Sequence, residues 1–287
     1  MARLNDLANR APLVRPVKWK VSDMVHRGCY HVVRRSSPKV HYQVYGMRRT
    51  GNHAVIEWLM QGREGRVIFC NDLQVGQHPA TAPIKRMRRG EGEPAIITSY
   101  EDLDPMAVER EVRPEWFGER RQVHHVLILR DPFNLFASRY VWKRDRGLRF
   151  RTDAAHRAQL VDLWKTHART FLEWRERTAD EGSMWHVLDY NRWVTDLAYR
   201  RRMGEALGST RPDAVIEEVG NFGGGSSFDG TAPVNGPRDR YLRRFEPLVD
   251  VPAFRALFAD EELVALYKRI FAPVPGVEGL FTASDAV

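Results

Sequence analysis

The chain has 287 residues, of which 43% are hydrophobic, and this size suits one large α/β domain or one domain with additions. It carries 45 Lys and Arg against 37 Asp and Glu, a formal net charge of +8 at pH 7. Such a surface suits a nucleotide, an acidic glycan, nucleic acid or a membrane face, and charge alone does not choose among them. The two cysteines, Cys29 and Cys70, and the absence of a Cys/His cluster at metal-ligand spacing indicate neither a structural zinc site nor a disulfide framework.

The first forty residues are a basic segment in which Lys and Arg far outnumber the acids Asp6 and Asp23. Two interpretations stay open: an amphipathic arm on an anionic membrane surface, or an extension packed across the main domain. The segment contains no long apolar run, so we expect no signal peptide and no membrane span. We therefore divide the chain into a basic N-terminal extension, 1–40, and a single α/β domain, 41–287.

A strand, a glycine turn and a helix are expected next. Residues 41–45 alternate polar with apolar side chains, as a strand does, and residues 54–60 are good helix formers. Between them, residues 46–51 keep the G-x-x-x-x-G frame of the triphosphate-binding loop. The Lys and Ser/Thr that follow in that motif are replaced here by Asn52 and His53, so the hydroxyl that binds Mg²⁺ is missing. The pattern predicts a nucleotide-borne anion held at a helix N-terminus without a metal.

Two arginines strengthen this interpretation. Arg48 and Arg49 add fixed positive charge to the loop, and a guanidinium fork matches tetrahedral oxyanions. The alternative is an ordinary basic turn, because the glycine spacing alone is a weak signal.

Three apolar runs predict further buried strands. Residues 67–70 and 94–99 are two of them, and we expect residues 74–93 between them to form a loop. The run 126–129 is the third, and it continues directly into Arg130-Asp131-Pro132.

The third run leads into a helix over 133–140. Asp131 suits the N-cap of this helix and Pro132 suits its first position. Arg130 leaves the strand at its carboxyl end, where open α/β sheets bind ligands, and Ser138 lies two turns along the helix. Together they suit a second phosphate group. Taken singly, each residue is better explained structurally, Arg130 as a helix-capping or surface arginine and Ser138 as a small residue that lets the helix pack closely.

Residues 46–53 and 129–140 together resemble the two cofactor motifs of sulfotransferases. That family uses 3′-phosphoadenosine 5′-phosphosulfate (PAPS) and leaves 3′,5′-adenosine bisphosphate (PAP) as the spent product. The resemblance implies that the first motif binds the 5′-phosphosulfate and the second the 3′-phosphate, with no metal. Arg49 stands where the family usually has Lys. Carried over by position, the cofactor ligands are Arg48, Arg49, Thr50, Gly51, Asn52, His53, Arg130 and Ser138.

A third segment, 185–190, resembles the family's later strand and its tyrosine-containing turn, so we add Tyr190 to the cofactor residues. We expect one helix over 191–207, ending at Gly208. Earlier in the chain a long helix is expected over 153–177, with Trp164 and Trp174 in the core. A closing helix is expected over 261–271.

A long glycine-rich loop, 219–237, precedes Arg238 and Arg240. Cytosolic sulfotransferases close over the nucleotide with an Arg-Lys-Gly segment that this chain does not have. The loop and Arg238 or Arg240 are candidates for that role, and a plain surface loop beside a basic helix is the alternative.

The resemblance also implies a mechanism. Arg49 and the loop N–H groups would stabilise charge on the oxygen that leaves the sulfuryl group, and His53 would bond a phosphosulfate oxygen or simply cap the helix. The acceptor hydroxyl needs a general base within hydrogen-bond reach. We favour Glu101, which follows the strand 94–99, over the competing candidates Asp72, His78 and His53.

We therefore predict a three-layer α/β/α fold with a central, mostly parallel sheet, P-loop-like and typical of sulfotransferases. The predicted function is sulfuryl transfer from PAPS to an acceptor hydroxyl on a carbohydrate, glycoconjugate or small molecule, in the cytoplasm. Contact with the inner membrane surface would come through the N-terminus. The alternatives are a P-loop kinase-like protein, disfavoured by Asn52-His53, a sulfotransferase-like protein that binds without turnover, and a nucleic-acid binder. Nucleic acid is not expected, since no recognised motif for it appears.

Overall fold

The computed structural model describes residues 28, 31, 39–79, 82, 84–111, 122–145, 154–178, 182–212 and 241–281. The N-terminal extension, the glycine-rich loop 219–237, Arg238 and Arg240 therefore lie outside the described residues, apart from residues 28, 31, 39 and 40. The choice between a membrane arm and a packed extension stays open.

The described residues contain a six-stranded sheet with the order β3-β2-β4-β1-β5-β6. Neighbouring strands are parallel except for β2 and β3, which are antiparallel. The predicted mostly parallel sheet is confirmed. Its strands are β1 (Val40–Gly46), β2 (Val67–Cys70), β3 (Ile84–Arg88), β4 (Ala95–Glu101), β5 (Gln122–Leu129) and β6 (Trp185–Asp189).

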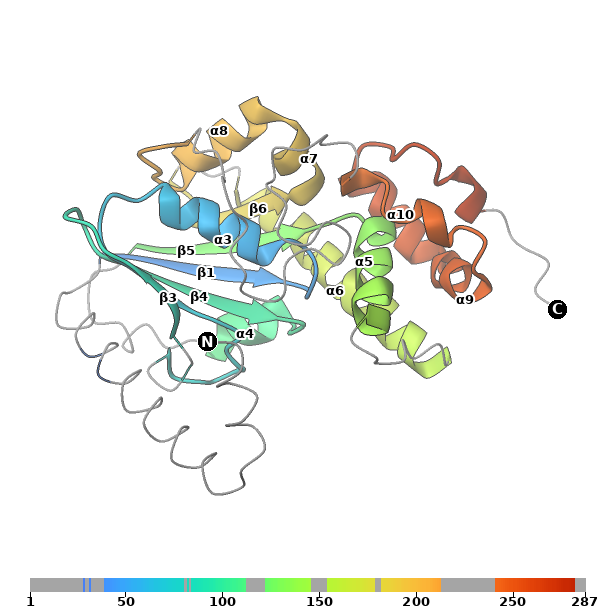
Figure 1. The fold of residues 1–287 in the computed structure, drawn as a ribbon, viewed down its shortest axis with the longest axis horizontal. Coiled ribbons are helices and arrows are strands. Elements are labelled where there is room, and N and C mark those ends of the chain that lie inside the picture. Colours follow the sequence, from blue (N-terminus) through green and yellow to red (C-terminus); the bar gives the residue numbers. More distant parts are fainter. Residues whose placement is uncertain are drawn as a thin grey trace, which may run out of the picture.

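Helices cover both faces of this sheet, which gives the three layers predicted (Figure 1). On one face lie α3, α7 and α8, and on the other lie α4 and α6, while α5, α9 and α10 gather beyond the carboxyl ends of the strands. The helices are α3 (Asn52–Gln61), α4 (Pro105–Glu111), α5 (Pro132–Asp145), α6 (Ala154–Arg177), α7 (Tyr190–Thr195), α8 (Leu197–Ala206), α9 (Pro252–Arg255) and α10 (Glu261–Ile270).

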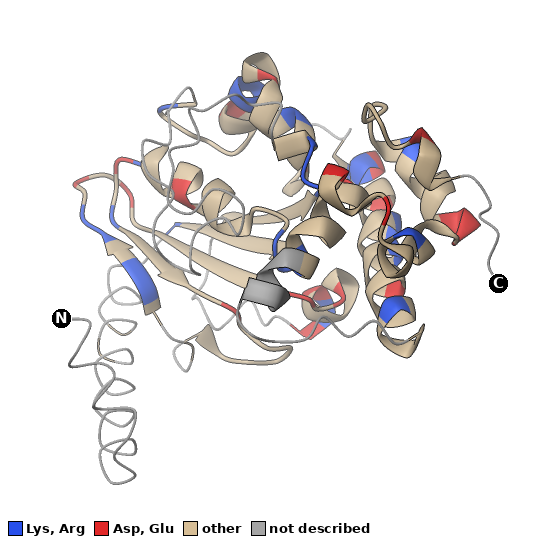
Figure 2. Ribbon diagram, turned by 45° about the vertical axis from the view of Figure 1, so that its right-hand side comes forward, with Lys and Arg blue, Asp and Glu red and all other residues tan. Residues whose placement is uncertain are grey.

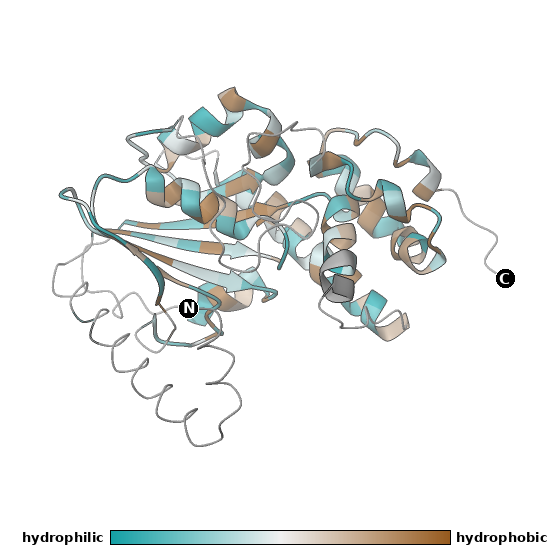
Figure 3. Ribbon diagram, viewed as in Figure 1, coloured by the Kyte–Doolittle hydropathy of each residue, from teal (hydrophilic) through white to brown (hydrophobic). Residues whose placement is uncertain are grey.

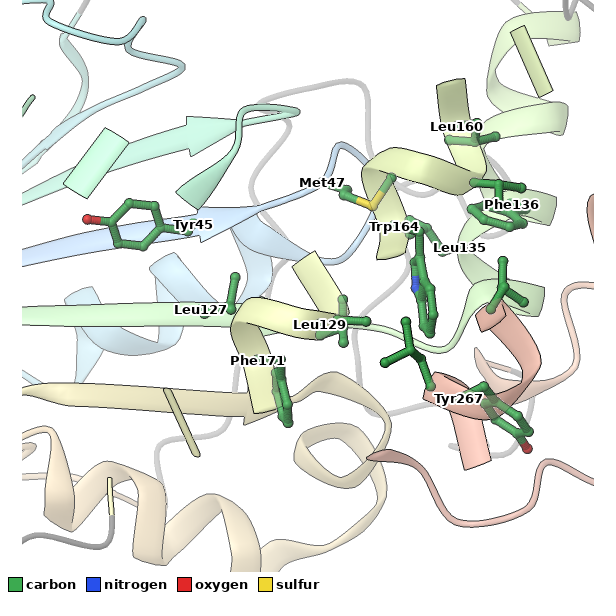
Figure 4. Close-up of a cluster of buried hydrophobic side chains, with 14 of the residues drawn as sticks. Tyr45, Met47, Leu127, Leu129, Leu135, Phe136, Leu160, Trp164, Phe171 and Tyr267 are labelled. Carbon is green, nitrogen blue, oxygen red and sulfur yellow. The ribbon is translucent and has the colours of Figure 1, made fainter. Parts of the chain in front are cut away.

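Each face of the sheet has its own apolar core, because successive strand residues point to opposite faces. Figure 3 shows apolar residues on the strands and on the helix sides that meet them. One core joins Val44 and Ile128 to α3, α7 and α8. The other joins Tyr45 and Leu127 to α5, α6 and α10, and Figure 4 shows Trp164 within it. Trp164 and Trp174 are fully buried, as predicted.

The strand register brings the functional segments together. Gly46 at the end of β1 pairs with Glu101 on β4 and with Ile128 on β5, and Leu129 pairs with Asp189 at the end of β6. The segments that follow these strands therefore leave one edge of the sheet side by side. This carboxyl edge is where the site is built.

Two predictions about secondary structure were wrong. Residues 74–93 are not a continuous loop, because they contain the edge strand β3. In β3, half-buried Ile84, Arg86 and Arg88 alternate with exposed Lys85 and Met87, and its basic character conceals the strand signal.

The predicted helix 191–207 is two helices. Asp196 has extended backbone angles, φ −111° and ψ 103°, which end α7, and its side chain accepts the Tyr199 N–H to start α8. Aspartate favours such caps over helix interiors because its carboxylate competes for backbone donors.

Candidate functional site

The predicted phosphate loop lies between β1 and α3. Gly51 caps α3 in the left-handed conformation, φ 112°, and its carbonyl accepts from Ala54 N at 3.0 Å and Val55 N at 3.2 Å. A Cβ on Gly51 would lie 2.1 Å from Cε2 of Tyr190, so only glycine fits there. The N–H groups of Asn52 and His53, the first two residues of α3, have no acceptor within the helix, and such a turn is suited to binding an anion.

The second predicted motif starts at the end of β5. Asp131 caps α5, since its Oδ1 accepts the Asn134 N–H at 2.8 Å, and Pro132 is the first residue of that helix, as predicted. Arg130 is buried between strand and helix, and Trp164 Nε1 donates to its carbonyl at 3.0 Å. The guanidinium of Arg130 donates to Tyr241 O at 2.7 Å.

The two motifs meet in one place. Arg49 Nε donates to Ser138 Oγ at 3.3 Å, although the two residues are 89 positions apart. Arg130 Nη1 also lies 3.4 Å from Arg49 O, and its Cζ lies 5.4 Å from the centre of the Tyr190 ring. Arg49, Ser138, Arg130 and Tyr190 therefore surround a common point at the carboxyl edge.

Electrostatics at this point call for a negative ligand. Burial, followed by the charge of Arg244, lowers the pKa of Arg130 to about 10, and Arg49 contributes in the same direction. The charge of Asp131 raises the pKa of Arg130, but by less than either burial or Arg244 lowers it. The guanidinium still carries its charge at neutral pH. A bound phosphate would restore favourable charge around it.

Orphaned polar atoms give a second sign that an anion fits. Within the part of the chain that the structure describes, the buried Thr50 Oγ1 and Arg130 Nε have no hydrogen-bond partner. Such atoms are rare in folded proteins, and a ligand oxygen is one way to satisfy a hydroxyl or a guanidinium N–H. The residues present thus fit anionic oxygen atoms at this edge of the sheet.

Arg48 turns to a different set of partners. Its Nη2 lies 2.7 Å from Asp72 Oδ2, and its Nε lies 3.6 Å from Glu101 Oε2 and 3.9 Å from Asp102 Oδ2. Burial opposes the charge of Arg48, but these three carboxylates raise its pKa. Its place among the phosphate ligands stays a prediction, because in this structure carboxylates balance its charge.

Asn52 and His53, the two residues that follow the loop, contact different strand ends, and Asn52 contacts the candidate base Glu101. Asn52 Nδ2 donates to Met47 O at 3.2 Å and to Glu101 Oε1 at 3.1 Å, so it ties the start of α3 to the end of β4. His53 Nε2 lies 2.9 Å from Asn71 Oδ1, directly after β2. Glu101 therefore lies beside the loop, whereas His53 faces the neighbouring strand end.

Three residues at this edge did not enter the predicted site. Arg244 is buried near Arg130, and its N–H donates to Asn134 Oδ1 at 2.8 Å. Asp102 and Arg139 pair at 2.6 Å and 3.0 Å. The available signals were position alone: Asp102 lies three residues after the predicted strand 94–99, and Arg139 directly follows Ser138.

Comparison with known proteins adds one finding. No protein-family model matches the chain, and no curated protein matches it. A mouse sulfotransferase is among the similar solved structures. The chain resembles mouse sulfotransferase SULT7A1 complexed with PAP, with 16% identity and a TM-score of 0.39, over 59% of this chain and 58% of that chain. The function is therefore inferred from the geometry of the site.

None of the helices that the structure describes is both long enough and apolar enough to span a bilayer. Figure 2 shows acidic and basic residues on the helices and at the strand ends, while the central strands are mostly free of both.

Proposed function

We propose that the chain is a sulfotransferase that moves a sulfuryl group from PAPS to an acceptor hydroxyl. The observation that carries this proposal is the contact of Arg49 with Ser138 beside buried Arg130. One motif supplies a helix N-terminus and a guanidinium, and the other supplies a second guanidinium and a hydroxyl. A nucleotide with phosphate groups at both the 5′ and the 3′ positions has the charge that this double site lacks.

Each residue has a distinct role in holding the nucleotide. The N–H groups at the start of α3, with Thr50 Oγ1 and Arg49, would hold the 5′-phosphosulfate. Arg130 and Ser138 would hold the 3′-phosphate, and Arg244 adds positive charge to the same pocket. Tyr190, which lies against Gly51 and Arg130, would bound the site on the β6 side. His53 and Asn52 support the loop through Asn71 and Met47.

PAPS supplies a sulfuryl group whose transfer leaves charge on the 5′-phosphate oxygen. Arg49 would stabilise that charge, because its half-buried guanidinium is oriented by Ser138 before the nucleotide binds. Its backbone is held at φ 74°, a conformation that non-glycine residues adopt only under constraint.

Glu101 is the proposed general base. It ends β4 in register with Gly46, and hydrogen bonding from Asn52 orients its carboxylate beside the loop. A carboxylate in this position would accept the proton of the acceptor hydroxyl as the hydroxyl oxygen attacks sulfur. Asp72 pairs with the same Arg48 guanidinium as Glu101 and is the main rival for this role.

The acceptor class is a further part of the proposal. We propose a hydroxyl on a carbohydrate or glycoconjugate, with a small metabolite as the alternative. A cytoplasmic enzyme with a basic N-terminus that touches the inner membrane surface would suit a lipid-linked sugar.

A transfer assay with radiolabelled PAPS tests the proposed function. Purified full-length chain is incubated with labelled donor, oligosaccharide and small hydroxyl acceptors, and EDTA. Label on an acceptor in the presence of EDTA supports the proposal. ATP turnover that needs Mg²⁺, with no PAPS consumed, would favour the kinase-like alternative, and tight PAP binding with no transfer would favour a binding protein without turnover.

A further inference from the structure

Asp102 joins three separate segments at the carboxyl edge. Its N–H donates to Gly46 O at 3.2 Å, which ties the end of β4 to the end of β1. Its Oδ1 accepts the Arg48 N–H at 2.9 Å and Arg139 Nη1 at 2.6 Å, and its Oδ2 accepts Arg139 Nη2 at 3.0 Å. Asp102 thus connects three segments: its backbone N–H binds β1, and its carboxylate binds the phosphate loop and α5.

Consecutive residues of α5 hold consecutive residues of the loop. Ser138 Oγ accepts from the Arg49 side chain at 3.3 Å, and Arg139 Nη1 lies 3.4 Å from Arg48 O. Because Asp102 binds Arg139 through both oxygens, it fixes the guanidinium that lies beside the loop carbonyl. A change at Asp102 is therefore transmitted to the position of Arg49 relative to Ser138.

The local backbone needs such support. Arg49 and Asp102 have φ values of 74° and 58°, in the left-handed region that L-residues avoid unless the surroundings impose it. Burial alone would raise the pKa of Asp102, but Arg139 and Arg48 lower it below its ordinary value. The carboxylate is consequently charged at neutral pH and can hold both partners.

We infer that Asp102 is a positioning residue that sets the spacing between the two phosphate pockets by clamping the loop to α5 through Arg139. It touches the loop and the helix, and it acts on the nucleotide only through Arg49 and Ser138. This inference rests on the proposed function, since the two pockets are those assigned to PAPS.

Calorimetric titration of the intact chain with PAP tests the clamp. Asp102→Ala should weaken PAP binding by roughly tenfold, and Asp102→Asn should weaken it less, because its amide oxygen still accepts the Arg48 N–H. Asp104→Asn is the matched control: it removes one charge two residues away, where the side chain is exposed and caps α4 through the Met106 N–H. Asparagine caps helices as well as aspartate does, so affinity should not change.

A double variant separates positioning from general damage to the fold. In an Arg49→Ala background, Asp102→Ala should change PAP affinity by less than roughly twofold, because the contact between Arg49 and Ser138 that the clamp positions is already lost. Thermal unfolding confirms that each variant is folded at the assay temperature, and Asp102→Asn replaces Asp102→Ala if the latter is not. Unchanged affinity in the Asp102 variants, or fully multiplicative losses in the double variant, would overturn the clamp alone. No PAP binding by the wild-type chain would instead overturn the proposed function.

Discussion

Two regions of the sheet bury polar side chains, and they differ in how those side chains are satisfied. His124, His125 and His186 on β5 and β6 form the histidine group. His124 Nδ1 lies 2.9 Å from His186 Nε2, and Tyr45 Oη lies 3.0 Å from His125 Nδ1. Burial, followed by nearby histidines and arginines, lowers the pKa of all three to about 4. These rings are neutral at pH 7 and bind one another or a tyrosine.

The carboxyl edge buries charge instead. Arg130 keeps its charge beside Arg49 and Arg244, and the described hydrogen bonds of its guanidinium go to carbonyl oxygens. The backbone at this edge is also strained, since Arg49, Asp72 and Asp102 all have positive φ. Neutral groups that satisfy each other build a core. Arginines placed close together beside a strained backbone instead indicate a site for a negative ligand. We therefore expect substitutions at the carboxyl edge to reduce binding or transfer, and substitutions in the histidine group to reduce the free energy of unfolding.

The largest effect is expected at the proposed base. Glu101→Gln keeps the side-chain shape and can still accept from Asn52, but it cannot take up a proton. Transfer from PAPS should fall by about 10²- to 10⁴-fold with little change in PAP affinity.

The matched variant for this prediction is Asp72→Asn, at the rival carboxylate. Near-normal transfer in Glu101→Gln with a collapse in Asp72→Asn would move the base to Asp72. A large loss of PAP affinity in Glu101→Gln would indicate that the residue supports the loop and is not a base.

A smaller loss is expected for Arg49→Ala. Turnover should fall by about 10²- to 10³-fold, because a preorganised donor to the leaving oxygen is lost, while PAP affinity falls much less. Arg49→Lys should recover part of the turnover, since a Lys ammonium keeps a positive charge near the leaving oxygen but lacks the guanidinium fork. Equal losses in turnover and PAP affinity would show that Arg49 only holds the bound nucleotide.

The histidine group should affect stability and leave function intact. A histidine in the unfolded chain has a pKa near 6.5, so as pH falls from about 6.5 to 4 the unfolded chain binds more protons than the folded one. The free energy of unfolding should then fall by about 1.4 kcal/mol per pH unit for each histidine. Urea unfolding at a series of pH values measures this slope.

His186→Asn removes one titrating ring and should reduce the slope by that amount, while PAP affinity at pH 7.5 stays at the wild-type value. An unfolding free energy that is constant from pH 7 to pH 5 would refute the assignment. So would a slope that is unchanged in the variant.

Most of the fold could be predicted because its signals are local. The buried strands appear as apolar runs, the phosphate loop as a glycine spacing, and α5 as Asp131-Pro132 after a strand. The edge strand β3 escaped detection because its residues are mainly basic and its stability comes from pairing with β2. The break at Asp196 escaped detection because no Pro or Gly marks it anywhere in residues 190–203.

The site was predictable only in part, because only its local motifs can be recognised in the sequence. Arg49, Gly51, Arg130 and Ser138 belong to local motifs, and the structure brings them together. The contacts that hold them do not follow any local pattern: Asp102 and Arg139 are 37 residues apart, and Asn134 and Arg244 are 110 apart. Such pairs exist only once the sheet places the strand ends side by side.

Calorimetric titration with PAP and with adenosine 5′-phosphate, for the wild-type chain and for Arg130→Ala, tests the central claim that two cationic pockets hold two phosphate groups of one nucleotide. We expect the 3′-phosphate to improve wild-type binding by roughly tenfold to a hundredfold through charge-assisted hydrogen bonds, and Arg130→Ala to remove most of that gain. Equal affinities for the two nucleotides in the wild-type chain, or an undiminished preference in Arg130→Ala, would contradict the account.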